Sequence, residues 1–373
     1  MKTTALEKYT VRDVLEYRGN PQLNHTIDDD NTIEEALRLM DLYDIVSLPV
    51  FGHSKSEAGR TSFVDIVSVY DLRDYVIQAE GLEEEVQFQL LSGRPSGKSM
   101  VLQHTVGQVV QSRKHASKEI SASASLEQLL TLFTTMGQHR VLITDLELGP
   151  QFPYHHSQRV PDHSPASSAN GDAKGRRERA TSIDSNCSSA HSSVEYYEEG
   201  DVVVCGLTQY DVVRFIQHHN HELWHSLDVS ALDIAREKHM LGKSHDDQRM
   251  PWPGLEQLSI YDTALSSMKK LRDSQASALP VVDRDGRLIT EVAGAGLRRL
   301  TTDSIGMLGK PVLAYMFGLK LTVARPYIVH QGFTLSQIMS GLLRMNCRRA
   351  WLVDDESRPI SVISLTDVLR HFL

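Results

Sequence analysis

Cysteine, aromatic side chains and long apolar runs are all scarce in this chain of 373 residues. Three cysteines, Cys187, Cys205 and Cys347, are too few and too widely spaced for a disulfide framework or a cysteine zinc site, and they fit a reducing compartment. No apolar run approaches the length that spans a bilayer, and residues 1–7 lack the apolar segment of a secretion signal. The net charge of −9 argues against a broad nucleic-acid surface. We therefore expect a soluble protein of the cytoplasm or the nucleus, with no membrane and no nucleic-acid partner.

The chain contains four copies of one strand-to-helix junction. In the most complete copy, residues 361–370, a β-branched strand ends at Ser364, and Asp367 opens an amphipathic helix three residues later. In a degraded copy Ala293 and Gly296 take the places of the hydroxyl and the carboxylate. The four copies lie at 64–72, 203–212, 288–297 and 361–370. Repetition of this kind predicts a repeat protein.

Each junction closes a longer unit with the order helix, strand, turn, strand, helix. In the first unit Thr32 and Glu35 form a capping box that predicts a helix start, and 45–51 is a short buried-strand pattern. A polar turn then leads to the strand 63–67 and to the helix that contains Asp71. The same order predicts an α/β (α+β) chain with the following parts: repeat 1 at 8–80, a linker at 81–105, repeat 2 at 106–220, a linker at 221–254, repeat 3 at 255–302 and repeat 4 at 303–373.

Repeat 2 contains a long insertion at 150–200, which is rich in Ser, His, Pro, Gly and charge and poor in large apolar residues. Such a segment buries too little surface to offset its ordering entropy, so we expect a disordered loop at a hairpin tip. Arg176 and Arg179 stand six and three residues before Ser182. This spacing suits phosphorylation of Ser182 by a basophilic kinase, and the phosphate would also recruit a phosphoserine-binding partner. The alternative is an unmodified tether.

The repeated unit resembles the CBS domain. Three stretches carry the resemblance: Ser-Ala-Leu-Pro-Val-Val-Asp at 277–283, His139-Arg140 before a strand, and Val-Ile-Ser-Leu-Thr-Asp-Val-Leu at 362–369. Four such units in one chain resemble the gamma subunit of AMP-activated protein kinase and its fungal relatives. The resemblance implies that the repeats pair into two Bateman modules, that the modules pack as a disc, and that clefts between paired repeats bind AMP, ADP or ATP.

By this resemblance, the hydroxyl and the carboxylate of each complete junction bind ribose. An ionised Asp in the first helical turn is stabilised by the helix dipole and can accept hydrogen bonds from both ribose hydroxyls. The implied ribose residues are Ser68, Asp71, Thr208, Asp211, Ser364 and Asp367. Basic residues just before the matching strands are implied to bind phosphate, namely His139, Arg140, Arg348 and Arg349. No metal, cofactor or catalytic residue is implied.

Several positions depart from the family pattern. Gly296 removes the carboxylate of repeat 3, so we expect a lost or altered site there. Repeat 1 has Asp44 where the family has a basic residue, repeat 4 has Cys347 where the family has His, and Asp65 replaces a small glycine. We therefore expect fewer than four occupied clefts, and a cleft that uses Asp367 if only one is filled. The alternative without ligand is that each Asp is a helix cap worth about 1 kcal/mol and each Arg a surface ion pair.

Two short motifs imitate enzyme sites. The stretch His-Glu-Leu-Trp-His at 221–225 matches the zincin pattern, but it continues a repeat helix within a His-rich tail, and a solvated helix end explains it better. Residues 93–99 imitate a phosphate-binding loop, but the spacing is one residue short and no convincing strand precedes it. We predict neither a zinc site nor a P-loop.

The leading hypothesis is a non-catalytic regulatory protein that senses adenine nucleotides and regulates a partner, such as a Ser/Thr kinase complex of the AMP-activated type. The alternative is a scaffold or inhibitor in stress or cell-cycle signalling, acting for example on a protein phosphatase, with little dependence on nucleotide. The insertion and the degraded third junction favour the alternative, whereas the retained Asp residues and His139-Arg140 favour sensing. An enzyme is disfavoured because no nucleophile–base pair or metal cluster is evident. The partner, and whether the disc forms a homodimer, are left open.

Overall fold

The computed structural model describes residues 6–19, 25–53, 61–96, 100–113, 118–136, 138–143, 198–199, 202–203, 205–222, 227–240, 255–321, 323 and 325–373. The predicted insertion at 150–200, apart from 198–199, and its Ser182 lie outside the described residues. Among the described helices, none combines the length and the apolar character that a bilayer crossing requires.

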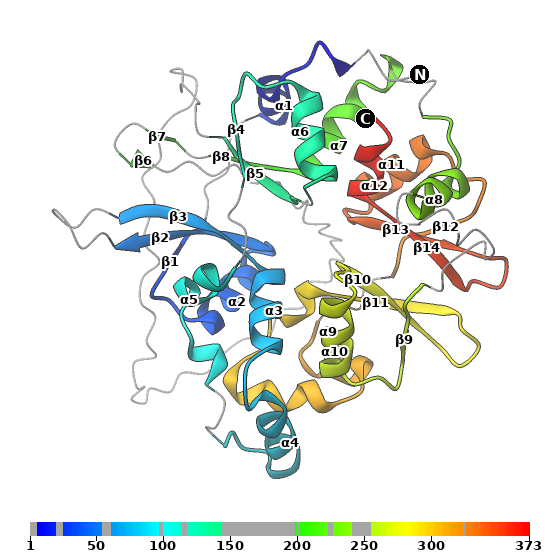
Figure 1. Cartoon of the computed structure of the whole chain (residues 1–373). Helices are drawn as coiled ribbons and strands as arrows, with labels where there is room; N and C mark the ends of the chain where they lie inside the picture. The colour runs from blue at the N-terminus through cyan, green and yellow to red at the C-terminus, as the bar shows by residue number, and fades with distance from the viewer. Residues whose placement is uncertain are drawn as a thin grey trace, which may run out of the picture.

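Four units with one topology make up the chain (Figure 1). Repeat 1 consists of β1 (Ile27–Asp28), α2 (Ile33–Leu42), β2 (Ser47–His53), β3 (Thr61–Ser68) and α3 (Val69–Ile77). Repeat 2 consists of β4 (Glu119–Ile120), α6 (Leu126–Thr134), β5 (Arg140–Ile143), β8 (Cys205–Thr208) and α7 (Gln209–His218). Repeat 3 consists of β9 (Leu258–Ser259), α9 (Ala264–Asp273), β10 (Ala278–Val282), β11 (Leu288–Ala293) and the 3-10 helix η4 (Gly294–Leu297). Repeat 4 consists of β12 (Ile328–Val329), α11 (Leu335–Arg344), β13 (Arg349–Val353), β14 (Pro359–Ser364) and α12 (Leu365–Arg370).

The remaining elements connect these units. They are α1 (Val11–Arg18), α4 (Leu82–Ser92), η2 (Val101–Gln103), α5 (Val106–Ser112), β6 (Glu198–Glu199), β7 (Val202–Val203), η3 (Asn220–Glu222), α8 (Ala231–Met240), η5 (Thr302–Gly309) and α10 (Val312–Gly318). In each repeat the short first strand runs parallel to the central strand, and the third strand runs antiparallel to it.

Local sequence explains where the repeat helices begin. Thr32 and Glu35 form the predicted capping box at the start of α2, and α6 and α11 begin with the boxes Ser125–Gln128 and Thr334–Gln337. In each box the N-cap hydroxyl accepts from the N3 amide while the N3 side chain accepts from the N-cap amide, so two otherwise unpaired helix donors are satisfied. In repeat 3 Ala293 supplies no such cap, and only the short 3-10 helix η4 follows β11.

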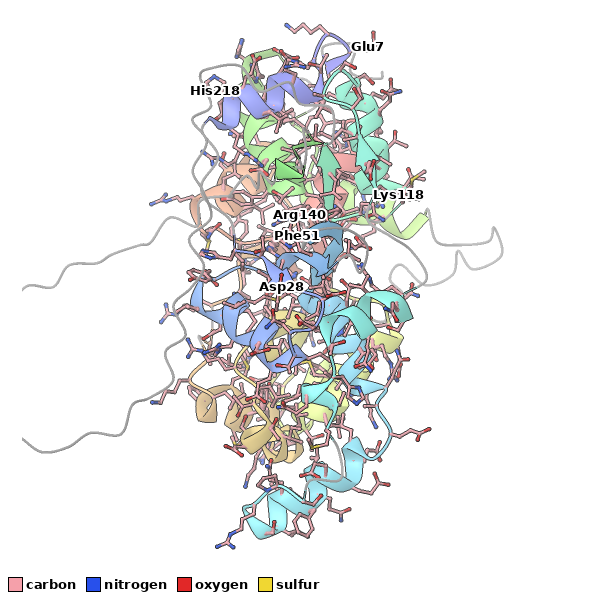
Figure 2. All side chains as sticks on the ribbon, turned by 90° about the vertical axis from the view of Figure 1, so that its left-hand side faces the viewer. Glu7, Asp28, Phe51, Lys118, Arg140 and His218 are labelled. Atoms are coloured by element: carbon pink, nitrogen blue, oxygen red, sulfur yellow. The ribbon has the colours of Figure 1, made fainter. Side chains whose placement is uncertain are left out.

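The helix that precedes each repeat packs on the neighbouring repeat. Isolated bridges join the cap residues of these helices to the cap residues of the repeat helices, in the pairs Thr10–Ser125, Thr32–Thr105, Ser230–Thr334 and Thr263–Pro311. Thus α1 lies on repeat 2, α5 on repeat 1, α8 on repeat 4 and α10 on repeat 3. Figure 2 shows Glu7, just before α1, and His218 of α7 at the same end of the molecule.

Two hydrophobic cores each combine two repeats. One core unites repeats 1 and 3 and includes Leu72 of α3 and Met268 of α9, whereas the other unites repeats 2 and 4 and includes Phe133 and Val368. The sheets make the other contacts: Ile66 packs against Leu142 between repeats 1 and 2, and Trp351 of repeat 4 donates to Glu291 of repeat 3. The four repeats therefore close into a ring around a common centre, and the edge-on view is narrow (Figures 1 and 2). The predicted disc of four repeats is confirmed.

Candidate functional site

The three complete junctions share one geometry at the first turn of α3, α7 and α12. In each, the hydroxyl donates to Oδ2 of the Asp at 2.6 Å, in the pairs Ser68–Asp71, Thr208–Asp211 and Ser364–Asp367. The backbone N–H of the same Ser or Thr also donates to Oδ2, at distances between 2.7 and 2.9 Å. The carboxylate thus completes a capping box and lies where the helix dipole favours negative charge.

A cation from a connecting segment reaches each of these carboxylates. Nη1 of Arg18, at the end of α1, lies 3.0 Å from Asp211 Oδ2. Nη1 of Arg113, which follows α5, lies 3.3 Å from Asp71 Oδ2, and Nζ of Lys238 in α8 lies 2.9 Å from Asp367 Oδ2. Each cation also donates to the strand carbonyl two residues before the hydroxyl, namely Gly206, Ile66 and Val362.

Access to the three carboxylates differs. The side chain of Asp71 is 24% exposed, against 0% for Asp211 and 5% for Asp367. Oδ1 of Asp367 accepts from Arg370 at 3.2 Å, whereas no donor among the described residues reaches Oδ1 of Asp71. Of the three junction carboxylates, that of Asp71 is therefore the one most open to a ligand in this conformation.

The charge state of Asp367 follows from its surroundings. Burial raises the pKa of this carboxyl, but the ammonium of Lys238 and the two hydrogen bonds from Ser364 outweigh burial, so the pKa lies below its ordinary value. Asp367 is therefore ionised at neutral pH and paired on both oxygen atoms, by Lys238 and by Arg370.

The matching position of repeat 3 holds no carboxylate. Gly296 stands where the Asp stands in the other repeats, and its carbonyl accepts from Oη of Tyr315 at 2.8 Å. The side chain of Met268 lies beside it, 3.3 Å from where a Cβ would be. This junction presents a carbonyl and apolar atoms, and it lacks the acceptor that a ribose diol would need.

His139 of repeat 2 lies close enough to interact electrostatically with Asp71 of repeat 1 and with Arg348 and Arg349 of repeat 4. Its ring is exposed to solvent and lies 5.9 Å from the ring of Tyr70, centroid to centroid. Surrounding protein atoms disfavour its charged form and lower its pKa; a hydrogen bond with Gln209 opposes this, and the charges of Arg348 and Arg349 add to it. Asp71 is close enough to favour the protonated ring. Repeats 1, 2 and 4 thus meet around an imidazole that is neutral at pH 7.

The three predicted phosphate-binding arginines lie in different surroundings. Arg349 is buried and donates to Glu291 across the contact of repeats 3 and 4. Glu291 also accepts a hydrogen bond from Trp351 Nε1 at 2.6 Å. Arg348 is exposed, and its guanidinium makes no hydrogen bond with the described residues. Arg140 begins β5 opposite Thr208 and lies against Gly206. Of the three, Arg348 is the one most available to an anion.

The sequence reasoning did not single out Arg18, Arg113 and Lys238. A signal was present, since each stands eight positions after the N-cap hydroxyl of its segment, in the pairs Thr10–Arg18, Thr105–Arg113 and Ser230–Lys238. Nothing in one repeat alone marks these residues, because their carboxylate partners belong to another repeat and are as much as 193 residues away in the chain.

The two enzyme-like motifs gain no support from the described residues. Residues 93–96 follow the end of helix α4, and Glu85 accepts from the backbone of Ser96 at 2.8 Å. In the zincin-like stretch, Asn220–Glu222 is a short 3-10 helix, and 223–225 lie outside the described residues. In the part of the chain that the structure describes, no group of three or more His, Cys, Asp or Glu side chains could hold a metal ion.

Comparison with known families agrees with this geometry. The CBS domain family model matches residues 10–78 and 321–373, which contain the junctions of repeats 1 and 4. These two regions are therefore similar to CBS domains in sequence. No curated protein matches the chain.

Solved structures extend the likeness to the whole chain. A protein of Methanocaldococcus jannaschii, described as a candidate archaeal homologue of the AMPK gamma subunit, superposes with a TM-score of 0.60 at 13% identity, over 96% of this chain and 99% of that one. An uncharacterised conserved protein of Pyrococcus horikoshii covers 98% of this chain and 100% of its own, with a TM-score of 0.45 at 13% identity. A structure of CBSX2 in complex with AMP covers 31% of this chain and 85% of its own, with a TM-score of 0.26 at 22% identity. The first of these supports the four-repeat CBS fold.

Proposed function

We propose that this chain is a non-catalytic regulatory protein that binds an adenine nucleotide (AMP, ADP or ATP) in the cleft of CBS repeat 1. The observation that carries the proposal is the carboxylate of Asp71. Its Oδ2 is held by Ser68 and Arg113, while its Oδ1 has no donor among the described residues and the side chain is 24% exposed. The two hydrogen bonds from Ser68 keep this carboxylate oriented, so it presents an acceptor to a vicinal diol without having to turn, even when Arg113 leaves Oδ2.

Neighbouring groups suit the rest of a nucleotide. Tyr70 follows Ser68 on the same helix turn, and its half-buried ring lies beside His139, with the guanidinium of Arg73 5.7 Å from its centroid. His139 and Arg348 supply a neutral imidazole and an exposed guanidinium, and a phosphate would favour protonation of the first and pair with the second. The sequence reasoning favoured the cleft that uses Asp367; the exposed fractions of the two carboxylates favour Asp71 instead.

Calorimetric titration of the full chain with AMP, ADP and ATP tests this proposal. We expect at least one nucleotide to bind and Asp71→Asn to weaken its affinity at least tenfold, because the amide cannot replace a charged acceptor. Binding at 100 times Kd would also stabilise the fold by about 2.7 kcal/mol, which a thermal shift detects. Glu80→Gln, at an exposed position after α3, is the matched control and should bind as the wild type does. Absence of heat and of a thermal shift at millimolar concentrations of all three nucleotides would contradict the proposal.

The regulated partner is a protein, and we propose a Ser/Thr kinase complex of the AMP-activated type. The support is the whole-chain similarity to the M. jannaschii protein, together with the four-repeat disc. A ligand shifts a partner's equilibrium only by the difference between its affinities for the two states, so the partner should change nucleotide affinity by the same factor.

The closed carboxylates of Asp211 and Asp367 favour a second candidate, a CBS scaffold or inhibitor of a signalling enzyme such as a protein phosphatase. Two of the three complete junctions are paired internally and inaccessible. Affinity purification from the native host in the presence and in the absence of nucleotide separates the candidates. A sensor retains its partner in amounts that depend on nucleotide, whereas a scaffold retains it equally in both conditions.

A further inference from the structure

The contacts of Arg18, Arg113 and Lys238 are one device repeated three times. Each cation stands eight positions after an N-cap hydroxyl, and each joins a carboxylate and a strand carbonyl of the neighbouring repeat. We call each cation–carboxylate pair a linker latch, because it fastens a connecting helix to the junction of a repeat. The three latches are Arg18–Asp211, Arg113–Asp71 and Lys238–Asp367.

Repeat 3 is a natural control within the same chain. The position eight residues after its cap residue Pro311 is Leu319, and the carboxylate position is Gly296. Both charged partners are therefore absent together, and Leu319 packs against the hydrophobic core of repeats 1 and 3. This agrees with the cost of burying one charge without its partner, which is much greater than the cost of replacing both.

One latch differs from the others in a second carboxylate. Asp65 is buried and pairs with Nη2 of Arg113, while Nη1 of the same guanidinium holds Asp71. The positions that match Asp65 are Cys205 in repeat 2 and Ser361 in repeat 4, neither of which is a carboxylate. In repeat 1 the guanidinium of Arg113 therefore pairs with two carboxylates, one through each Nη atom.

We propose that Asp65 allows the ion pair between Arg113 and Asp71 to open, and that the chain therefore binds a single nucleotide. In the bound state the ribose diol occupies Asp71, and Arg113 stays paired with Asp65. This inference rests on the proposed function and specifies its site and stoichiometry. When a diol takes Asp71, Arg113 keeps an ionic partner. The carboxylates of Asp211 and Asp367 are less accessible, with side chains 0% and 5% exposed, and a diol that took either one would also break its ion pair with Arg18 or Lys238, which opposes binding.

Calorimetry with AMP, or with whichever of the three nucleotides binds most tightly, tests Asp65 as a positioning residue. We expect a stoichiometry of one per chain, a Kd at least tenfold weaker for Asp65→Ser, and a Kd within threefold of the wild type for Asp65→Glu, which restores the second carboxylate. Asp65→Ser introduces the residue found at the matching position of repeat 4 and leaves Asp71 in place. A serine variant that binds as tightly as the wild type, or a stoichiometry of two or three, overturns this inference and leaves the proposed function standing. A wild type that binds no nucleotide overturns both.

Hydrogen exchange without nucleotide tests the latches themselves on the full chain. Lys238→Met should raise the exchange rates of the α8 amides at least tenfold, because the helix loses its attachment to Asp367 and Val362. Arg236→Met is the matched control, since Arg236 lies on the same helix and pairs only with the exposed side chain of Asp233 among the described residues. It should leave those rates within twofold. Equal effects of the two variants overturn the latch.

Discussion

At the scale of single residues, the three complete junctions illustrate what a motif predicts and what it leaves open. Ser68, Thr208 and Ser364 each precede an Asp by three residues and were predicted to bind ribose together with it; in the structure all three form the same capping box with that Asp. The motif does not state whether the carboxylate faces solvent, because that depends on a cation from a distant segment. The ribose assignment of Asp211 and Asp367 therefore stays a prediction, and the structure adds a reason to prefer Asp71.

His139 should make stability depend on pH. Surrounding protein atoms disfavour the charged ring and lower its pKa in the folded chain, so the unfolded chain binds more protons between the lowered pKa and the ordinary value near 6.5. Stability then falls as pH decreases through this window. We expect the wild type to lose more stability between pH 7.5 and 5.5 than His139→Gln does, as measured by urea unfolding. The control is His330→Gln, at an exposed position outside the centre, which should lose as much as the wild type. Equal losses in wild type and His139→Gln would contradict the role of this ring.

At the scale of elements, the sequence predicts the repeat better than it predicts the connections. The helices and hairpins follow from local signals such as the box Thr32–Glu35 and the turn at Gly286, which has a φ of +79°. The exchange of α1, α5, α8 and α10 between neighbouring repeats could not be predicted. The sequence of a capped amphipathic helix shows which of its faces is apolar but does not identify the repeat on which that face packs. Sequence bounds such as 303–373 for repeat 4 therefore include α10, which lies on repeat 3.

The contact of α3 with η4 provides a test of how repeats 1 and 3 pack. A Cβ at Gly294 would lie 2.7 Å from Cδ1 of Tyr70, which is closer than real Cβ contacts come. Gly294→Ala should therefore destabilise the chain by roughly 1–3 kcal/mol, as overpacking of a closed contact does, measured by chemical unfolding. Gly332→Ala is the control, because nothing lies within 4 Å of its added methyl group. In the background of Tyr70→Ala the Gly294→Ala penalty should largely disappear; an undiminished penalty would contradict the clash.

At the scale of the whole molecule, two kinds of contact close the ring in different directions. The sheets join repeat 1 to repeat 2 and repeat 3 to repeat 4, through Ile66–Leu142 and Glu291–Trp351. The helices join repeat 1 to repeat 3 and repeat 2 to repeat 4, and polar contacts such as Tyr210 Oη to the carbonyl of Leu343, at 3.0 Å, cross that seam. Since each core contains residues from both halves of the chain, neither half encloses a complete core.

This arrangement predicts that the two halves of the chain need each other to fold. Separately produced chains 1–226 and 227–373 would each expose the helical faces that line the two shared cores, so we expect each half alone to aggregate or to unfold without cooperativity. Co-expressed, the halves should form a 1:1 complex that elutes with the size of the intact chain. Gly294→Ala in the second half should weaken this complex, because it disturbs the contact with Tyr70 of the first half, whereas Gly332→Ala should not. Two stable, monomeric halves that do not associate would contradict the shared cores and would require each sheet pair to fold as an independent module.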